Sequence, residues 1–307
     1  MQRRDDLRAW VRKPLLCILR LIGHQGWIRY GLRSRIIRLF TRSHVGRSFG
    51  FQADFLRFKF TGDLNNDIDW EVFFFGQNER DVLELITDLL RKKTGPICLD
   101  VGANCGTHSL VMSGFSAQVH SFEPDTRALA ALKENVKINN IGNIHVHDFA
   151  LGDKTCEMDL YLAKNGDSGW STFVYQDCEP FYDGRVPVKV MKGDDIIEEL
   201  GLRNIDLIKI DVEGYEKNVL MGLKKTISRF RPVIIMEFTD FTHQALKDKE
   251  ELAHVIKGYE TYEIKERGHT LFFFERRGYR LTKFDFTNFD FLMHNVLCLP
   301  GRNAGQE

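Results

Sequence analysis

The sequence Cys98-Leu-Asp-Val-Gly-Ala-Asn-Cys-Gly-Thr-His108 has the pattern of a buried strand, a glycine-bearing turn and the start of a helix. The apolar run over 97–101 is typical of a parallel strand that is covered on both faces. Gly102 and Gly106 stand where the backbone must turn sharply and approach a ligand without a Cβ. Thr107 can cap the helix, whose first N–H groups would face an anionic group. The stretch therefore predicts a site for a nucleotide-like ligand.

A second apolar strand, Val119-His-Ser-Phe-Glu-Pro-Asp125, follows about twenty residues on. Glu123 at its end is placed to accept hydrogen bonds from a ribose diol. The glycine spacing does not fit a dinucleotide, because Asn104 replaces the middle glycine of Gly-x-Gly-x-x-Gly. The alternative is an ordinary strand–turn–helix with a surface glutamate. We favour a nucleotide-like cofactor other than a dinucleotide.

The composition is that of a soluble globular enzyme, with 43% hydrophobic and 28% charged residues over 307 positions. The net charge is zero, but twelve Lys and Arg residues face two Asp residues through Arg47. This segment therefore carries about +10 and the rest of the chain about −10. None of the six cysteines forms a Cys-x-x-Cys pair, which indicates reduced thiols and a cytoplasmic location.

The basic N-terminal region has helical periodicity, and two roles are consistent with it. Pro14 could open a helix that Gly23 and Gly26 could close. Such a segment could lie on an anionic membrane surface, or it could pack on the main domain with its arginines solvated. The apolar run at 15–19 is too short to span a membrane and is a poor signal peptide. The residues expected on one apolar face are Leu7, Val11, Leu15, Ile18 and Ile22.

Alternating strands and helices dominate the remaining chain. Alternation over 50–75 predicts a hairpin-like lead-in, and a helix should follow over 78–92. The order beyond it predicts a parallel, doubly wound α/β sheet, and a final strand that runs antiparallel is expected. Strands are expected at 97–101, 118–122, 144–148, 205–210, 233–237, 259–265, 270–274 and 294–299, and helices at 107–114, 125–139, 192–200 and 214–229.

Two further strand ends carry polar side chains, where ligands of open α/β sheets bind. Asp148 and Phe149 are placed to meet an adenine, although a loop aspartate after a strand is nearly as good an interpretation. Lys209, Asp211 and Glu213 crowd charge into an apolar strand end. Desolvation and repulsion should perturb their pKa values, which favours a functional role over a structural ion pair.

These segments resemble the FkbM family of S-adenosylmethionine-dependent methyltransferases. The resemblance covers roughly residues 70–300 and leaves the N-terminal arm outside. One departure is Gly193-Asp194-Asp195, where the family commonly has Leu-Asp-Asp. The segments that carry the resemblance are Asp100-Val-Gly-Ala-Asn-Cys-Gly106, Phe122-Glu-Pro124, Lys209-Ile-Asp-Val-Glu-Gly-Tyr-Glu216 and Arg231-Pro-Val-Ile-Ile-Met-Glu237, with Gly76-Gln-Asn-Glu79, Ser168 to Thr172 and Asn295-Val-Leu-Cys-Leu-Pro300 in support.

The resemblance implies a Rossmann-like class I methyltransferase fold and transfer of a methyl group from S-adenosylmethionine to a hydroxyl, often of a glycan or natural product. It also implies that Asp211 or Glu213 lies near the transferred methyl. Because a sugar hydroxyl must lose its proton, we expect Asp211 to act as the base, with Glu213 or Glu237 as substitutes and His243 and His269 less favoured. A divalent cation at the three carboxylates is conceivable, but no ligand spacing supports one, so no metal is expected. The cofactor-binding candidates are Glu79, Asp100, Gly102, Asn104, Gly106, Thr107, Glu123, Asp148 and Phe149.

We expect three parts: a basic arm over 1–47, lead-in strands and a helix over 48–95, and the methyltransferase domain over 96–300. The expected partner is a small-molecule or glycan acceptor, in lipid-linked form if the arm contacts a membrane. A protein or nucleic-acid methyltransferase is the main alternative, with the arm as a clamp. Against it, the strand end at Asp211 lacks an Asn-Pro-Pro-aromatic element. A third reading is a non-catalytic scaffold with a degenerate cofactor fold.

Overall fold

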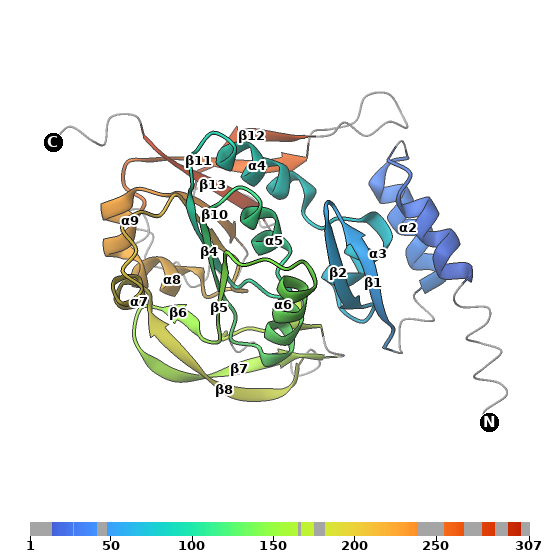
Figure 1. Cartoon of the computed structure of the whole chain (residues 1–307), viewed down its shortest axis with the longest axis horizontal. Coiled ribbons are helices and arrows are strands. Elements are labelled where there is room, and N and C mark those ends of the chain that lie inside the picture. The colour runs from blue at the N-terminus through green and yellow to red at the C-terminus, as the bar shows by residue number, and fades with distance from the viewer. Residues whose placement is uncertain are drawn as a thin grey trace. The chain divides into compact units, whose positions relative to one another are not determined.

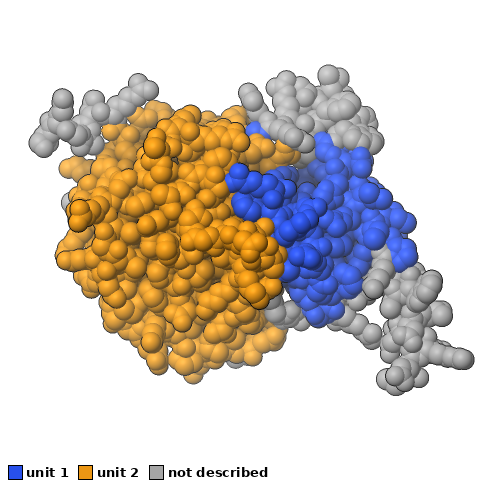
Figure 2. Space-filling model, viewed as in Figure 1, with its two compact units in different colours: residues 1–79, 267–278 blue, residues 80–266, 279–307 orange. Residues whose placement is uncertain are grey.

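The computed structural model describes residues 14–26, 28–41, 48–164, 167–174, 182–238, 255–266, 278–285 and 294–301. The chain forms two compact units, one of residues 1–79 with 267–278 and one of residues 80–266 with 279–307 (Figure 2). The division of the chain at 47 and 95 that the sequence suggests stays a prediction.

The first unit combines a hairpin with helices. Its strands pair antiparallel, with Gly50 opposite Asp63 and Phe55 opposite Phe58, as the aromatic alternation predicts. The helix over 14–23 ends at Gly23 as expected. The remaining elements are α2 (Tyr30–Thr41), β1 (Gly50–Phe55), β2 (Phe58–Asp63) and α3 (Asp67–Phe75).

Helix α3 is not part of the sequence expectation, which extends the alternating pattern to Phe75. The side chain of Asn66 caps this helix by accepting hydrogen bonds from the N–H groups of Ile68 (3.0 Å) and Asp69 (3.2 Å). Gly76 ends it with a left-handed φ of 72°. The Asn65-Asn66 pair is therefore a helix start rather than only a turn.

The expected face of the first helix is partly wrong. Ile18 is 55% exposed, whereas Leu16 and Leu19 are buried against the aromatic side chains of α3. Gly23 sets this orientation, because a Cβ there would lie 2.0 Å from the carbonyl oxygen of Phe74. Leu15 and Ile22 are partly buried as expected, and Leu7 and Val11 lie outside the described residues.

The second unit is built on an eight-stranded sheet in the order β12-β11-β13-β10-β9-β3-β4-β5 (Figure 1). The run from β10 to β5 is parallel, and β13 lies antiparallel between β10 and β11. This is the expected mostly parallel sheet with a reversed last strand. The strands are β3 (Ile97–Val101), β4 (Gln118–Phe122), β5 (Ile144–His147), β9 (Leu207–Ile210), β10 (Val233–Phe238), β11 (Tyr259–Glu266), β12 (Tyr279–Lys283) and β13 (His294–Pro300).

Helices cover both faces of this sheet (Figure 1). The expected helix over 214–229 is two short helices that meet at Leu223. The central strands of the sheet are buried on both sides, which explains their continuous apolar sequences. The helices are α4 (Arg80–Leu90), α5 (Thr107–Ser113), α6 (Thr126–Ile138), α7 (Gly193–Glu199), α8 (Glu216–Gly222) and α9 (Lys224–Phe230).

A second sheet in this unit has the order β6-β8-β7 and does not appear in the sequence expectation. β7 and β8 form a long antiparallel pair with a register shift at Leu162/Ala163 (Figure 1). β12 is likewise unexpected, and the strand expected at 270–274 lies outside the described residues. No helix in the described part of the chain has the length and apolar character to span a membrane. The strands of the second sheet are β6 (Ala150–Gly152), β7 (Cys156–Ala163) and β8 (Tyr182–Lys192).

Candidate functional site

The loop after β3 is shaped by its contact with the neighbouring strand end. Gly102 has a φ of 79°, and a Cβ there would lie 1.7 Å from the carbonyl oxygen of Asp211. The N–H groups of Gly102 and Ala103 donate to the carbonyl oxygen of Phe122, at 3.0 and 3.1 Å. The glycine is therefore required by the fold itself, because the position of its missing Cβ is filled by the backbone after β9.

The N-cap of helix α5 is a glycine, which has no side chain to cap the helix. Gly106 is the N-cap, with a φ of 94° and no side-chain cap hydrogen bond, so the expectation that Thr107 caps this helix is wrong. Thr107 is the first helical residue and is buried. A Cβ on Gly106 would lie 2.5 Å from Cδ1 of Leu132 on α6.

Glu123 holds the loops after β3 and β4 together. Its buried carboxylate accepts hydrogen bonds from the N–H of Asn104 (2.8 Å) and the N–H of Asp125 (2.7 Å), one on each oxygen. Burial raises the pKa of Glu123 to about 8. Each carboxylate oxygen can accept a second hydrogen bond, so the residue retains capacity for a ligand hydroxyl.

Asp100 lies beneath this loop. Its carboxylate accepts a hydrogen bond from the hydroxyl of Ser109, which also bonds to Ser121. Burial raises the pKa of Asp100 and lowers the pKa of the neighbouring His108 to about 4. Asp100 is only 1% exposed, so it supports the loop from inside the protein.

The two residues predicted to meet an adenine differ in exposure. Asp148 is exposed directly after β5. Phe149 is partly buried and lies 5.8 Å from Phe122 between ring centroids. Both residues follow β5 directly, and their contact with an adenine stays a prediction.

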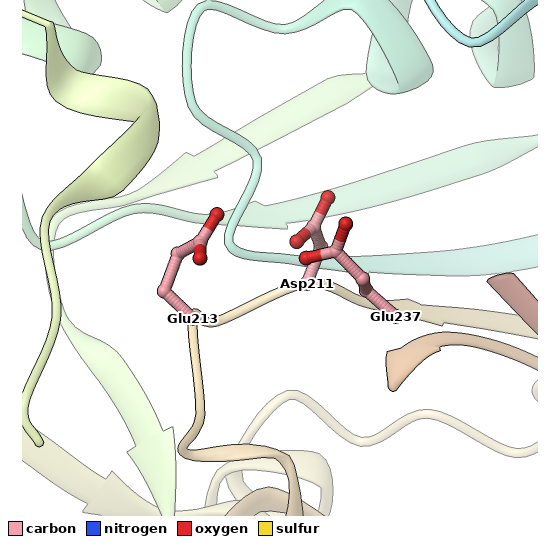
Figure 3. A group of neighbouring side chains, drawn as sticks. All are labelled: Asp211, Glu213 and Glu237. Carbon is pink, nitrogen blue, oxygen red and sulfur yellow. The ribbon is translucent and has the colours of Figure 1, made fainter. Parts of the chain in front are cut away.

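The three carboxylates predicted as candidate bases come together (Figure 3). Asp211 and Glu213 follow β9 and Glu237 lies near the end of β10, and one oxygen of each lies within 4.8 Å of the others. We call these three residues the carboxylate group. Glu213 has a left-handed φ of 50°, which is uncommon for a residue with a side chain. Figure 3 shows Asp211 and Glu237 close together, with Glu213 beside them.

Lys209 supplies the positive charge beside this group. Its Nζ lies 2.8 Å from Oδ2 of Asp211, and the lysine is fully buried on β9 opposite Asp100. Burial raises the pKa of Asp211, but the Lys209 ammonium and a hydrogen bond with Glu237 outweigh burial and lower it. The lowered pKa favours the carboxylate form of Asp211.

A further segment crosses these strand ends, and its role is not evident from the sequence. We call residues 167–174 the bridging segment; it includes the 3₁₀ turn η2 (Ser168–Trp170). Ser168 Oγ donates to Oδ1 of Asn104 at 3.1 Å, after β3. Ser171 Oγ donates to Asp125 at 2.9 Å, after β4. Thr172 Oγ1 donates to the carbonyl oxygen of Glu213 at 2.6 Å, after β9.

The hydroxyls of the bridging segment therefore tie three strand-end loops into one edge. The small-residue run at 168–172 is the only signal of this role in the sequence. A short polar run is typical of any surface loop, which is why the spacing of these residues does not identify their partners.

Three carboxylates this close could also coordinate a divalent cation. Acidic groups are common without one, and the Lys209 ammonium already neutralises Asp211. We assign no metal. Glu79 belongs to the other compact unit and has a left-handed φ of 43°. His243 and His269 lie outside the described residues.

Comparison with known proteins identifies relatives of this chain. The 2-O-methyltransferase NoeI of Sinorhizobium fredii is 30% identical over 171 residues, which cover 51% of this chain and 68% of NoeI. The hexuronic acid methyltransferase AglP of Haloferax volcanii is 26% identical over 162 residues, which cover 52% of this chain and 62% of AglP. The chain thus spans about two thirds of the length of each relative.

Among solved structures, a methyltransferase FkbM from Methylobacillus flagellatus is similar at 16% identity and a TM-score of 0.41, over 86% of this chain and 60% of that one. The family model of the methyltransferase FkbM domain matches residues 100–281. That range contains the glycine loop, Glu123, the bridging segment and the carboxylate group. The chain belongs to the FkbM family and is a methyltransferase.

Proposed function

We propose that this methyltransferase transfers the methyl group of S-adenosylmethionine to a sugar hydroxyl. The observation that carries the proposal is the position of the carboxylate group directly beside the glycine loop, where the backbone at Gly102 meets that of Asp211. A loop that suits the donor and a group that suits a proton acceptor thus share one edge of the sheet.

The donor side is the edge formed by the ends of β3, β4 and β5. We assign the backbone N–H groups around Gly106 and Thr107 to the carboxylate end of the cofactor, since a helix start favours an anionic group. Glu123 would accept from the ribose diol, and Asp148 and Phe149 would flank the adenine. The other residues assigned to this side are Asp100, Gly102 and Asn104.

The acceptor side is the carboxylate group. S-adenosylmethionine supplies an activated methyl carbon that an oxygen can attack in line, so placing the acceptor oxygen is the main task of the protein. A sugar hydroxyl must lose its proton as the new bond forms. Asp211 is ionised beside Lys209 and is our preferred proton acceptor, with Glu213 and Glu237 as neighbours that orient the hydroxyl. Such general-base help contributes typically 10²–10⁴-fold.

The nature of the acceptor rests on the relatives. Their names describe a 2-O-methyltransferase and a hexuronic acid methyltransferase, which supports a carbohydrate acceptor here. We place the reaction in the cytoplasm, because the cysteines of the described residues are free thiols.

Incubation with methyl-labelled S-adenosylmethionine tests the proposal. The acceptors are a panel of pyranosides that includes D-glucuronic acid, an extract of cell glycans, and bulk RNA and protein. We expect label in a glycan O-methyl ether, lost in Asp211→Asn. Label in RNA or protein alone would support the main alternative. Cofactor binding with no labelled product in any pool would support a scaffold.

A further inference from the structure

The two helices at the start of the described chain are apolar on two opposite faces. Their inner face packs on α3: Leu16, Leu19 and Ile37 are buried in one cluster with Trp70 and Phe74. Packing of this kind is sufficient to explain an ordinary amphipathic helix. It does not explain the apolar residues on the other side.

The outer side carries large apolar residues at helical spacing. Ile18 and Leu21 lie three residues apart on the first helix, and Leu32 and Leu39 lie seven apart on α2, so each pair shares one helix face. We call Ile18, Leu21, Leu32, Leu39 and Phe40 the outer face. Among the described residues, only Leu56 and Trp170 are other large hydrophobic residues with comparable exposure. The exposed fractions are 55% for Ile18, 65% for Leu21, 47% for Leu32, 75% for Leu39 and 52% for Phe40.

The two helices that carry the outer face have charged residues of one sign. Residues 14–41 contain five arginines and no aspartate or glutamate. Arg29 and Arg35 are exposed. Arg20 and Arg38 place their guanidinium groups over the rings of Phe73 and Trp70, at 5.2 and 4.6 Å from the centroids. Their positive charges therefore lie at the border of the outer face.

Apolar residues flanked by arginines match an anionic bilayer surface, which offers hydrocarbon below a layer of negative headgroups. Docking of this face on the same face of a second copy would bring like charges together. The positive sign also excludes a basic partner. We propose that the outer face binds the surface of an anionic lipid bilayer, with the helix over 14–23 and α2 lying in the headgroup layer. A lipid-linked glycan is the acceptor that this placement would serve.

Co-sedimentation of the full chain with vesicles tests the proposal without reference to enzymatic activity. The probes are vesicles of phosphatidylcholine alone and vesicles with one third phosphatidylglycerol. We expect binding to the anionic vesicles only, weakened by salt. Leu21→Gln with Leu39→Gln should reduce binding at least tenfold. Arg29→Gln and Arg35→Gln should each reduce it by on the order of fivefold.

Leu56→Gln is the matched control, because Leu56 is 54% exposed in the same unit but lies between β1 and β2. It should bind vesicles as the wild type does. All substituted side chains are exposed, so the thermal midpoint should stay unchanged. Equal binding to both kinds of vesicle, or equal binding by the leucine pair variant and the control, would overturn the proposal. A dimer that the leucine substitutions dissociate, with no vesicle binding, would assign the face to a second copy.

Discussion

The carboxylates after β4 and those after β9 and at the end of β10 lie at the same edge of the main sheet, but their surroundings differ. Glu123 is occupied by two backbone N–H groups, and Asp125 caps α6 and binds Arg127. The carboxylate group instead has its members facing one another, with Lys209 as a cation beside them. We therefore propose that the carboxylates after β4 shape a binding loop, whereas the carboxylate group acts on a bound hydroxyl.

The largest effect should come from the contact between the loop after β3 and the backbone after β9. Gly102→Val would drive a Cβ to 1.7 Å from the Asp211 carbonyl oxygen at a φ of 79°. We expect a loss of more than about 4 kcal/mol in the free energy of unfolding and no cofactor binding. Gly142→Ala is the control, because no heavy atom lies within 4 Å of its missing Cβ. Urea unfolding measures the free energy of unfolding of both variants. Equal values would contradict the close contact between Gly102 and Asp211.

The next largest effect should come from a substitution in the carboxylate group. Asp211→Asn keeps the shape of the side chain and an oxygen for Lys209 but removes the negative charge. Turnover should fall by roughly 10²–10⁴-fold. Glu237→Gln, made in parallel, should cost less, because we assign Glu237 to orienting the hydroxyl rather than to accepting its proton. Near wild-type turnover in Asp211→Asn would show that another group takes the proton.

A smaller effect should follow from loosening the bridging segment. Thr172→Val removes the hydroxyl that bonds to the Glu213 carbonyl, while Thr172→Ser retains it. Because a buried hydrogen bond lost on one side costs about 1–3 kcal/mol, we expect roughly tenfold lower kcat in the valine variant and near-normal kcat in the serine variant. The Kd for the cofactor should stay unchanged in both. Equal kcat values would separate the bridging segment from catalysis.

The smallest effect is a pH dependence of stability at Glu123. Its pKa rises from an ordinary 4.5 to about 8 in the fold. The protonated carboxyl therefore favours folding, and this contribution is complete below pH 4.5 and lost as the pH rises through about 8. Glu123→Gln should lower Tm by a few degrees at pH 5, where it loses one acceptor, and by less at pH 8. A difference in Tm that is constant over this range would contradict the buried state of the carboxyl.

The strand ends of the site could be predicted from sequence because their signals are local. The bounds of β3 and β4 follow from apolar runs that end in glycine or proline. The grouping of Asp211 with Glu237 followed from the resemblance and from the rule that parallel strands end at one edge.

Other features depend on contacts between distant residues. The role of Thr172 is set by the backbone of Glu213, and the rotation of the first helix is set by the contact of Gly23 with Phe74. The helix over 14–23 has apolar residues on two faces, so periodicity alone selects the wrong one at Ile18. The N-cap of α5 at Gly106 rather than at Thr107 likewise follows from the packing of Leu132.

The central claim is that the donor binds at the loops after β3 and β4, whereas the acceptor hydroxyl binds at the carboxylate group. Calorimetry of S-adenosylmethionine binding to Glu123→Ala and Asp211→Asn, side by side, tests it most directly. We predict that Glu123→Ala loses binding while Asp211→Asn binds with the wild-type Kd. Wild-type binding by Glu123→Ala together with loss of binding in Asp211→Asn would contradict it.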